Sequence, residues 1–194
     1  MHQLPEPARE RRLTPDQPAE RGAALGGAHS WGSGKAPLLL GIMGGVVILD
    51  YITKLVVMRS MRPYQTVDVV GEFVRLTFIE NTGAAFGIHV GGYDRVVFLV
   101  LSAGALIALG AMFWATPARD RVRLVAIAAI CGGAIGNLLD RLRSASGVVD
   151  FIDVGLGNLR WPIFNVADIA VTIGAIMLAL SLWGEERSRE QHAP

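Results

Sequence analysis

Residues 164–183 read FNVADIAVTIGAIMLALSLW, an apolar stretch with one aspartate, Asp168, near its start. A helix needs about 20 predominantly apolar residues to cross a membrane, and this stretch has that length. A charged side chain in the hydrocarbon costs roughly 2.5 to 3.5 kcal/mol even on the lenient insertion scale, so an ionisable residue in such a segment indicates a function. The stretch predicts a membrane helix that carries a functional carboxyl group.

Three more apolar segments precede this one, and the composition of the whole chain agrees with them. Hydrophobic residues make up 52% of the 194 positions, and the mean hydropathy of +0.42 is too high for an ordinary soluble domain. The remaining length is too short for a second folded domain. We therefore predict a membrane all-α fold in a single domain, residues 36–184, with helices near residues 37–58, 95–115, 122–142 and 162–183.

The two ends of the chain are predicted to be tails. Residues 1–35 are rich in Pro, Gly, Ala, Arg and Glu and cannot bury enough apolar surface to fold, so we predict a disordered segment. A cleaved signal sequence is not expected, because the first apolar stretch starts late and continues through Asp50 and Lys54. Residues 185–194 are predicted to be a second tail.

The segment between the first two helices predicts a small β-sheet beside the membrane. Residues 66–70 and 73–78 are β-branched and aromatic runs, and the second partly alternates apolar and polar residues as a half-buried strand does. The segment between the third and fourth helices is predicted to be a loop that contains Asp150.

Several classes of function are disfavoured by the composition. The net charge is +1 and no basic stripe alternates with aromatic residues, so we expect no nucleic-acid partner. The four histidines are scattered and no HExxH motif is present, so neither a zinc protease nor another bound metal or cofactor is expected. The single Cys131 lies in an apolar run and is interpreted as a buried hydrophobic residue.

Polar residues of three helices are predicted to form one layer near one face of the membrane. Alternate helices run in opposite directions, and at 1.5 Å per residue all of these groups lie within roughly 12 Å of the face opposite the two termini. Within each helix they are three or four residues apart and so share one side. The set comprises Asp50, Lys54, Asn137, Asp140, Arg141, Asn165 and Asp168, with Asp150 in the loop directly above it.

Two interpretations of this layer remain open for Asp50, Lys54, Asp140 and Arg141. They could be polar clamps that hold the helices together through hydrogen bonds worth about 1 kcal/mol each, or they could serve a site. For Asp150 and Asp168, the family resemblance described below favours a catalytic role. Two close carboxylates cannot both ionise, so one keeps its proton near neutral pH and the pair supplies an acid and a base. Such a pair can activate water against a peptide carbonyl without a metal, and its pKa values belong to the pair.

Four sequence blocks resemble the signature blocks of lipoprotein signal peptidase, also called signal peptidase II. The blocks occur in order with the four helices, and Asp50 followed by Lys54 fits the same pattern. They are Asn81-Thr82-Gly83-Ala84-Ala85-Phe86, Gly136-Asn137-Leu138-Leu139-Asp140-Arg141, Val148-Val149-Asp150-Phe151 and Phe164-Asn165-Val166-Ala167-Asp168. The resemblance covers residues 37–183, and the long tail before residue 36 has no counterpart in the blocks.

This resemblance implies an aspartic endopeptidase of the bacterial inner membrane, with four transmembrane helices and a small extracytoplasmic sheet. Its substrates would be prolipoproteins, which it would cleave just before a cysteine that carries diacylglycerol. Asp150 and Asp168 match the catalytic pair. The resemblance places both termini in the cytoplasm, whereas the Lys and Arg residues near the helix ends number seven on each side and do not decide the orientation. Positions that would support the site or the substrate are Asp50, Lys54, Asn81, Gly83, Asn137, Asp140, Arg141 and Asn165.

Three other functions are set against this one. A proton- or ion-coupled transporter would place its site near the membrane midplane between internal repeats, and no repeat is present. A non-catalytic membrane protein that binds lipopeptides differs from the enzyme, in sequence, only by the second aspartate. A serine peptidase with Lys54 as its base is disfavoured, because no serine is placed to meet Lys54, whose expected partner is Asp50 one turn away.

Overall fold

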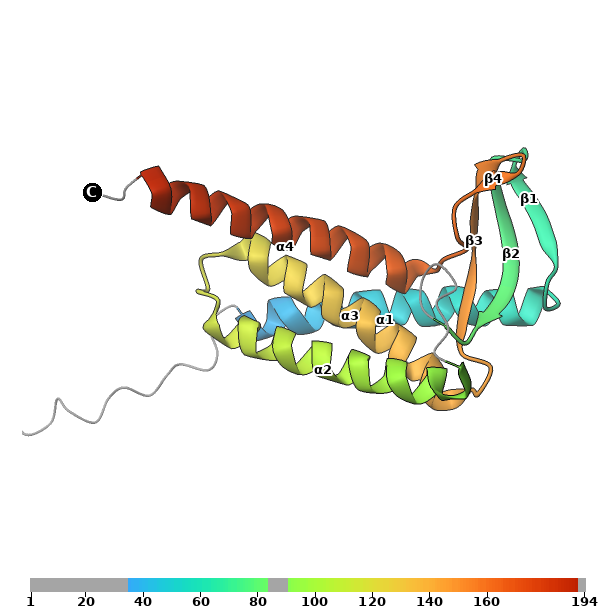
Figure 1. The fold of residues 1–194 in the computed structure, drawn as a ribbon, viewed down its shortest axis with the longest axis horizontal. Coiled ribbons are helices and arrows are strands. Elements are labelled where there is room, and N and C mark those ends of the chain that lie inside the picture. The colour runs from blue at the N-terminus through green and yellow to red at the C-terminus, as the bar shows by residue number, and fades with distance from the viewer. Residues whose placement is uncertain (1–34, 84–90, 192–194) are drawn as a thin grey trace, which may run out of the picture. The chain divides into compact units, whose positions relative to one another are not determined.

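Four long helices form the bundle in the computed structural model, which describes residues 35–83 and 91–191 (Figure 1). All four are long and apolar enough to cross a membrane, as predicted. α3 is the central helix, since it packs against each of the other three and holds the fully buried residues Leu124, Ala126 and Ile127. The helices are α1 (Lys35–Ser60), α2 (Asp94–Ala115), α3 (Arg121–Arg143) and α4 (Val166–Gln191).

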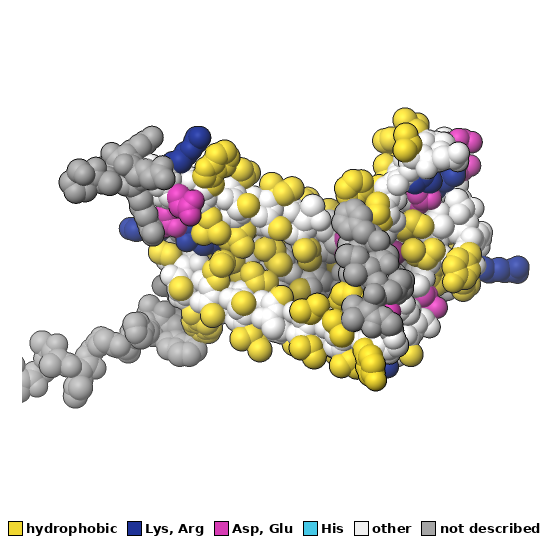
Figure 2. All heavy atoms as spheres, in the orientation of Figure 1, with side chains coloured by type: hydrophobic (Ala, Val, Ile, Leu, Met, Phe, Trp, Pro, Cys, Tyr) yellow, Lys and Arg dark blue, Asp and Glu magenta, His cyan; other side chains and the backbone are white. Residues whose placement is uncertain are grey.

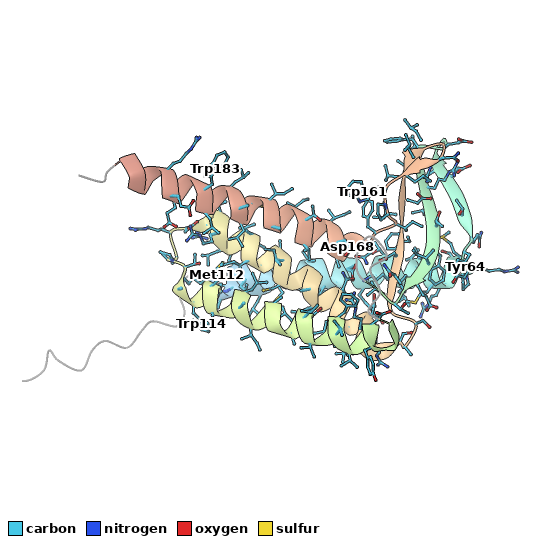
Figure 3. All side chains as sticks on the ribbon, in the orientation of Figure 1. Tyr64, Met112, Trp114, Trp161, Asp168 and Trp183 are labelled. Carbon is cyan, nitrogen blue, oxygen red and sulfur yellow. The ribbon has the colours of Figure 1, made fainter. Side chains whose placement is uncertain are left out.

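The surface of the bundle has the polarity expected of a membrane protein. Hydrophobic side chains cover the helices on the face shown in Figure 2, while charged side chains gather at the two ends. Trp114 and Trp183 lie toward one end of the bundle, and Trp161 lies beside the sheet at the other (Figure 3). Tryptophan concentrates where a membrane meets water, and the positions of these three residues at the two ends of the bundle agree with that tendency.

A four-stranded antiparallel sheet in the order β1-β2-β3-β4 lies at one end of the bundle (Figure 1). The prediction of a small sheet is confirmed by β1 and β2, but the placement of Asp150 in a loop was wrong, because Asp150 lies on β3. The sequence did not reveal this strand because its partner is β2, about 70 residues earlier, and two aspartates interrupt its apolar pattern. The strands are β1 (Thr66–Val70), β2 (Val74–Asn81), β3 (Val148–Leu156) and β4 (Leu159–Arg160).

The sheet is attached to the bundle by a small apolar core. Val57 of α1 packs with Phe78 of β2 and with Val149 and Phe151 of β3, and all four side chains are buried. Residues on opposite sides of a strand alternate, so Asp150 points away from this core. The packing of β3 against α1 thus turns Asp150 to the other face of the sheet.

The fourth helix begins and ends later than predicted. Trp161 and Phe164 still pair with β3, through hydrogen bonds from Trp161 N to Val154 O (2.8 Å) and from Phe164 N to Ile152 O (3.1 Å). The helix therefore starts at Val166 rather than near residue 162, and it continues to Gln191, so the predicted C-terminal tail is helical as far as that residue. At the other end, Lys35 already belongs to α1, and the predicted disordered segment otherwise lies outside the described residues.

Candidate active site

A cavity of about 450 Å³ opens where the sheet meets α3 and α4. Its polar lining comprises six of the predicted site residues, namely Asn81, Gly83, Asn137, Arg141, Asp150 and Asp168. Its apolar lining includes Phe164, which belongs to one of the four sequence blocks, and five residues that the sequence did not indicate, Trp161, Pro162, Ile163, Ile169 and Ile173. The only signal for Trp161, Pro162 and Ile163 was their position immediately before the block that begins at Phe164. The cavity combines two carboxyl groups with an apolar wall.

Asp150 reaches this cavity from β3 and is only 3% exposed. Its two carboxyl oxygens accept hydrogen bonds from two amides, Asn81 Nδ2 at 3.0 Å and Asn165 Nδ2 at 2.7 Å. Burial raises the pKa of Asp150 to about 7, the hydrogen bond from Asn81 opposes this rise, and the negative charge of Asp168 adds to it. Asp150 therefore exchanges its proton close to neutral pH.

Asp168 lies in the first turn of α4 and is half-buried, at the sheet end of the bundle (Figure 3). One carboxyl oxygen accepts a hydrogen bond from Asn137 Nδ2 at 2.8 Å, and the other accepts one from Asn165 N at 3.1 Å. In return Asn165 Oδ1 accepts a hydrogen bond from Asp168 N at 2.9 Å. This reciprocal pair has the form of a capping box, so the start of α4 fixes the orientation of the Asp168 carboxyl group.

Asn165 connects the two carboxyl groups and is fully buried. Its Nδ2 donates to Asp150 Oδ1 at 2.7 Å and lies 3.1 Å from Asn137 Oδ1, whose own Nδ2 donates to Asp168. Two asparagine side chains thus join Asp150 to Asp168 in one hydrogen-bonded network. Sequence spacing alone placed Asn165 and Asp168 on one helix face, whereas the structure places Asn165 between the two aspartates.

A buried cluster of charged residues contacts this hydrogen-bonded network through Asn137. Lys54 Nζ is 2.7 Å from Asp50 Oδ2, 2.7 Å from Asp140 Oδ2 and 3.0 Å from Asn137 Oδ1. Lys54 has the expected partner one turn away, together with two partners from α3 that the sequence did not indicate. An ammonium group has three N–H donors, so these three acceptors use all of its hydrogen-bonding capacity.

The charge cluster contacts the segments that carry both aspartates. Asp50 Oδ1 accepts a hydrogen bond from Ala167 N at 2.9 Å, one residue before Asp168. Asp140 Oδ2 accepts a longer one from Val149 N at 3.4 Å, one residue before Asp150. Asp50, Lys54 and Asp140 thus connect helices, as a clamp would, and also contact the backbone next to each site aspartate.

Gly136 makes room for this cluster where α1 meets α3. A Cβ atom at this position would lie 2.6 Å from Asp50 Oδ2 and 3.3 Å from Ala167 Cβ. A side chain here would displace either Asp50 or the start of α4. The glycine is therefore required by the close approach of the Asp50 carboxyl group to the α3 backbone.

Arg141 and Gly83 also line the cavity. Arg141 Nη2 donates to Gly83 O and Nη1 donates to Asn137 O, each at 3.4 Å, and the guanidinium lies 5.4 Å from the centre of the Phe98 ring. Gly83 N donates to Asn81 Oδ1 at 3.0 Å, which turns the Asn81 Nδ2 toward Asp150. Arg141 Nε is buried and has no hydrogen-bond partner among the described residues.

All ten predicted site residues therefore lie in or next to this one cavity. Within residues 35–83 and 91–191, no group of three or more His, Cys, Asp or Glu side chains is arranged to hold a metal ion. The arrangement offers a pair of carboxyl groups, one of which titrates near neutral pH, with fixed amide donors beside an apolar wall.

Comparison with known proteins identifies the family. Residues 42–184 match the peptidase A8 family, described as Signal peptidase (SPase) II. The chain is 39% identical over 147 residues to the lipoprotein signal peptidase of Syntrophotalea carbinolica, covering 75% of this chain and 91% of that one. It is 38% identical over 142 residues to the lipoprotein signal peptidase of Halothermothrix orenii, covering 73% of this chain and 92% of that one.

A solved structure agrees with these sequence matches. It is described as a bacterial membrane enzyme, is 32% identical, and superposes with a TM-score of 0.68 over 80% of this chain and 93% of its own. This similarity in fold supports the same assignment as the sequences. This chain belongs to the signal peptidase II family.

Proposed function

We propose that this chain is a membrane aspartic endopeptidase that removes the signal peptide from diacylglyceryl-modified prolipoproteins by cleaving before the lipidated cysteine. Its family supports the peptidase activity and the prolipoprotein substrates. The observation that supports the aspartic mechanism is the pair Asp150 and Asp168, which the Asn165 and Asn137 amides join at one cavity. The transporter and binding-protein alternatives have no such support, since the family is one of peptidases.

The proposed reaction uses one proton shared by the two carboxyl groups. The ionised carboxylate accepts a proton from a water molecule as that water attacks the peptide carbonyl carbon. The protonated carboxyl group donates to the carbonyl oxygen and afterwards a proton passes to the leaving amine. The amides of Asn81, Asn137 and Asn165 hold both carboxyl groups in place throughout, so neither group must reorganise.

The first test of the function is cleavage of a diacylglyceryl-modified prolipoprotein by the purified full chain in detergent. We expect cleavage before the modified cysteine, at a rate that a chelator does not change. The matched control is the same prolipoprotein without its lipid, which we expect to be a much poorer substrate. A chain that cleaves neither form would refute the proposed function, and a chelator-sensitive rate would refute the metal-free mechanism.

The rate of cleavage is expected to fall above about pH 7. The active pair holds one proton, and burial raises the pKa of Asp150 to about 7, so above that pH the pair loses its last proton and has no acid left. The measurement is kcat/KM between pH 5 and pH 9, with a substrate that has no ionisable group in this range. A kcat/KM that rises steadily through pH 7 to pH 9 would contradict the shared proton.

The chain is a multi-pass protein of the bacterial inner membrane, as its four apolar helices and its family indicate. We further propose that residues 36–184 form the peptidase domain, that both termini lie in the cytoplasm, and that the cavity lies near the outer face. Four crossings place both ends of the bundle on one side, and the sheet lies at the other end of the helices (Figure 1).

This orientation can be tested with single cysteines in a Cys131→Ser background. Leu159 in β4 is 85% exposed, and Glu186, near the end of α4, is also exposed. With an impermeant maleimide on intact spheroplasts, we expect labelling of Leu159→Cys but not of Glu186→Cys until the membrane is permeabilised. The reverse pattern would invert the orientation.

A further inference from the structure

A chain of polar side chains crosses all four strands of the sheet. Thr66 Oγ1 of β1 lies 3.0 Å from Thr77 Oγ1 of β2, which donates to Asp153 Oδ2 of β3 at 2.9 Å. Asp153 Oδ1 in turn accepts a hydrogen bond from Arg160 Nε of β4 at 2.6 Å. Neither Asp153 nor Arg160 belongs to the sequence blocks or lines the cavity. This series of contacts therefore lies outside the reacting groups.

Arg160 is the last residue in this series of hydrogen bonds, and each of its three guanidinium nitrogens donates a hydrogen bond. Besides the ion pair with Asp153, Nη2 donates to Asp153 O and Nη1 donates to Glu72 O, both at 3.1 Å. The Asp153 side chain is 8% exposed and that of Arg160 is 19% exposed, so water competes little for the ion pair between them. Charge-assisted hydrogen bonds in such surroundings are short and directional.

Gly155 allows Arg160 to lie this close to β3. The two residues are paired in the sheet, and a Cβ atom at position 155 would overlap Leu159 O and the Cα of Arg160. Gly155 N also donates to Phe73 O at 3.0 Å, which ties the β1–β2 turn to the same place. The local backbone is thus shaped around the Arg160 side chain.

The residues that follow Arg160 in the sequence form the apolar wall of the cavity. Trp161, Pro162, Ile163 and Phe164 follow directly, and then Asn165 reaches Asp150. β4 is only two residues long and pairs with β3 at two positions, which is too little to fix a strand by itself. The backbone of Trp161 and Phe164 is also hydrogen-bonded to β3, and the contacts of Arg160 add a side-chain anchor immediately before this wall.

We propose that Arg160 is a positioning residue for substrate binding, which acts through Asp153 to hold the Trp161–Phe164 wall against the cavity. The inference rests on the proposed function and extends it to a residue of the sheet. Arg160 contacts neither carboxyl group, and Asp153, unlike Asp150, does not line the cavity. Loss of Arg160 should therefore weaken binding and leave the chemical step intact.

The test compares kinetic constants for Arg160→Gln, Arg160→Lys and the control Arg75→Gln in the full chain. Arg75 is matched to Arg160 because its side chain also forms an ion pair on the same sheet, with Asp68 at 2.9 Å, but its two ion pairs, to Asp68 and Glu72, stay within the β1–β2 hairpin. We expect Arg160→Gln to raise KM about tenfold with kcat within about twofold, the pattern of lost uniform binding. Arg160→Lys, which keeps the charge, should fall between Gln and wild type, and Arg75→Gln should match wild type.

A drop in kcat at unchanged KM, or an Arg160→Gln variant equal to Arg75→Gln, would overturn the inference. If Arg160→Gln does not fold, the milder Thr77→Val removes one hydrogen bond from Asp153 and should raise KM about threefold with kcat retained. Unchanged kinetics in Thr77→Val would then count against the inference.

A second readout does not depend on peptidase activity. With Trp31, Trp114 and Trp183 replaced by Phe, the fluorescence anisotropy of Trp161 reports the mobility of the wall. We expect Arg160→Gln to lower this anisotropy and Arg75→Gln to leave it unchanged. A wild type that does not cleave prolipoprotein would refute the proposed function alone, whereas an unchanged Trp161 signal would refute the role of Arg160.

Discussion

Asp150→Asn and Asp168→Asn are each expected to lower the rate of prolipoprotein cleavage by about 10³-fold or more, because each variant removes one half of the acid–base pair. Asparagine has nearly the size of aspartate, so the surrounding packing is retained. The measurement is kcat of the purified variants in detergent with saturating diacylglyceryl-modified prolipoprotein. Asp68→Asn is the matched control, since Asp68 is an exposed carboxylate on the same sheet with 60% of its side chain accessible.

The pH dependence of thermal stability serves as the folding control, and its direction follows from the pKa of Asp150. Burial raises the pKa of Asp150 from 3.8 to about 7, so the folded state binds the Asp150 proton more tightly than the unfolded state does. Stability from this group is therefore present at low pH and is lost as the pH rises from about 4 to about 7. A neutral asparagine side chain does not ionise, so Asp150→Asn should lack this part of the pH dependence of thermal stability. Activity retained by either folded variant would show that the pair is structural.

The sequence predicted the helices and the polar layer because both depend on local patterns. Hydropathy over about 20 residues identifies a membrane helix, and counting along each helix gives the depth of its polar residues. The prediction that Asp50 pairs with Lys54 follows in the same way from a spacing of four residues and is confirmed at 2.7 Å. Contacts within one helix can thus be predicted from the sequence.

Contacts between segments far apart in the sequence could not be predicted from local patterns. Strand β3, which carries Asp150, pairs with β2, and nothing local to residues 148–156 specifies that partner. The hydrogen bond that Ala167 N donates to Asp50 Oδ1 joins residues 117 positions apart. Asn165 was expected only to support the site, and its position between the two aspartates depends on how α4 meets β3 and α3. The resemblance to a family pointed to these residues, but their contacts required the structure.

Lys54→Met is expected to destabilise the folded protein by about 3 to 5 kcal/mol, the range found when one partner of a buried ion pair is removed. Lys54 is 1% exposed, and its loss would leave the Asp50 and Asp140 carboxylates close together without a cation. Methionine retains most of the side-chain volume, so the effect should come from charge. The measurement is the free energy of unfolding in mixed detergent, and a variant as stable as wild type would contradict the prediction.

A triple variant separates the two roles that the charge cluster can have. In Asp50→Asn/Lys54→Met/Asp140→Asn the buried charges are gone, so most of the lost stability should return, since a neutral replacement of a buried ion pair is often tolerated. Asn137 Oδ1 would still lack the donor that Lys54 supplies at 3.0 Å, which leaves the Asn137 amide less constrained to donate to Asp168. We therefore expect stability to recover without full activity. Recovery of both would mean that the cluster only clamps the helices, because the orientation of Asn137 would then not depend on Lys54.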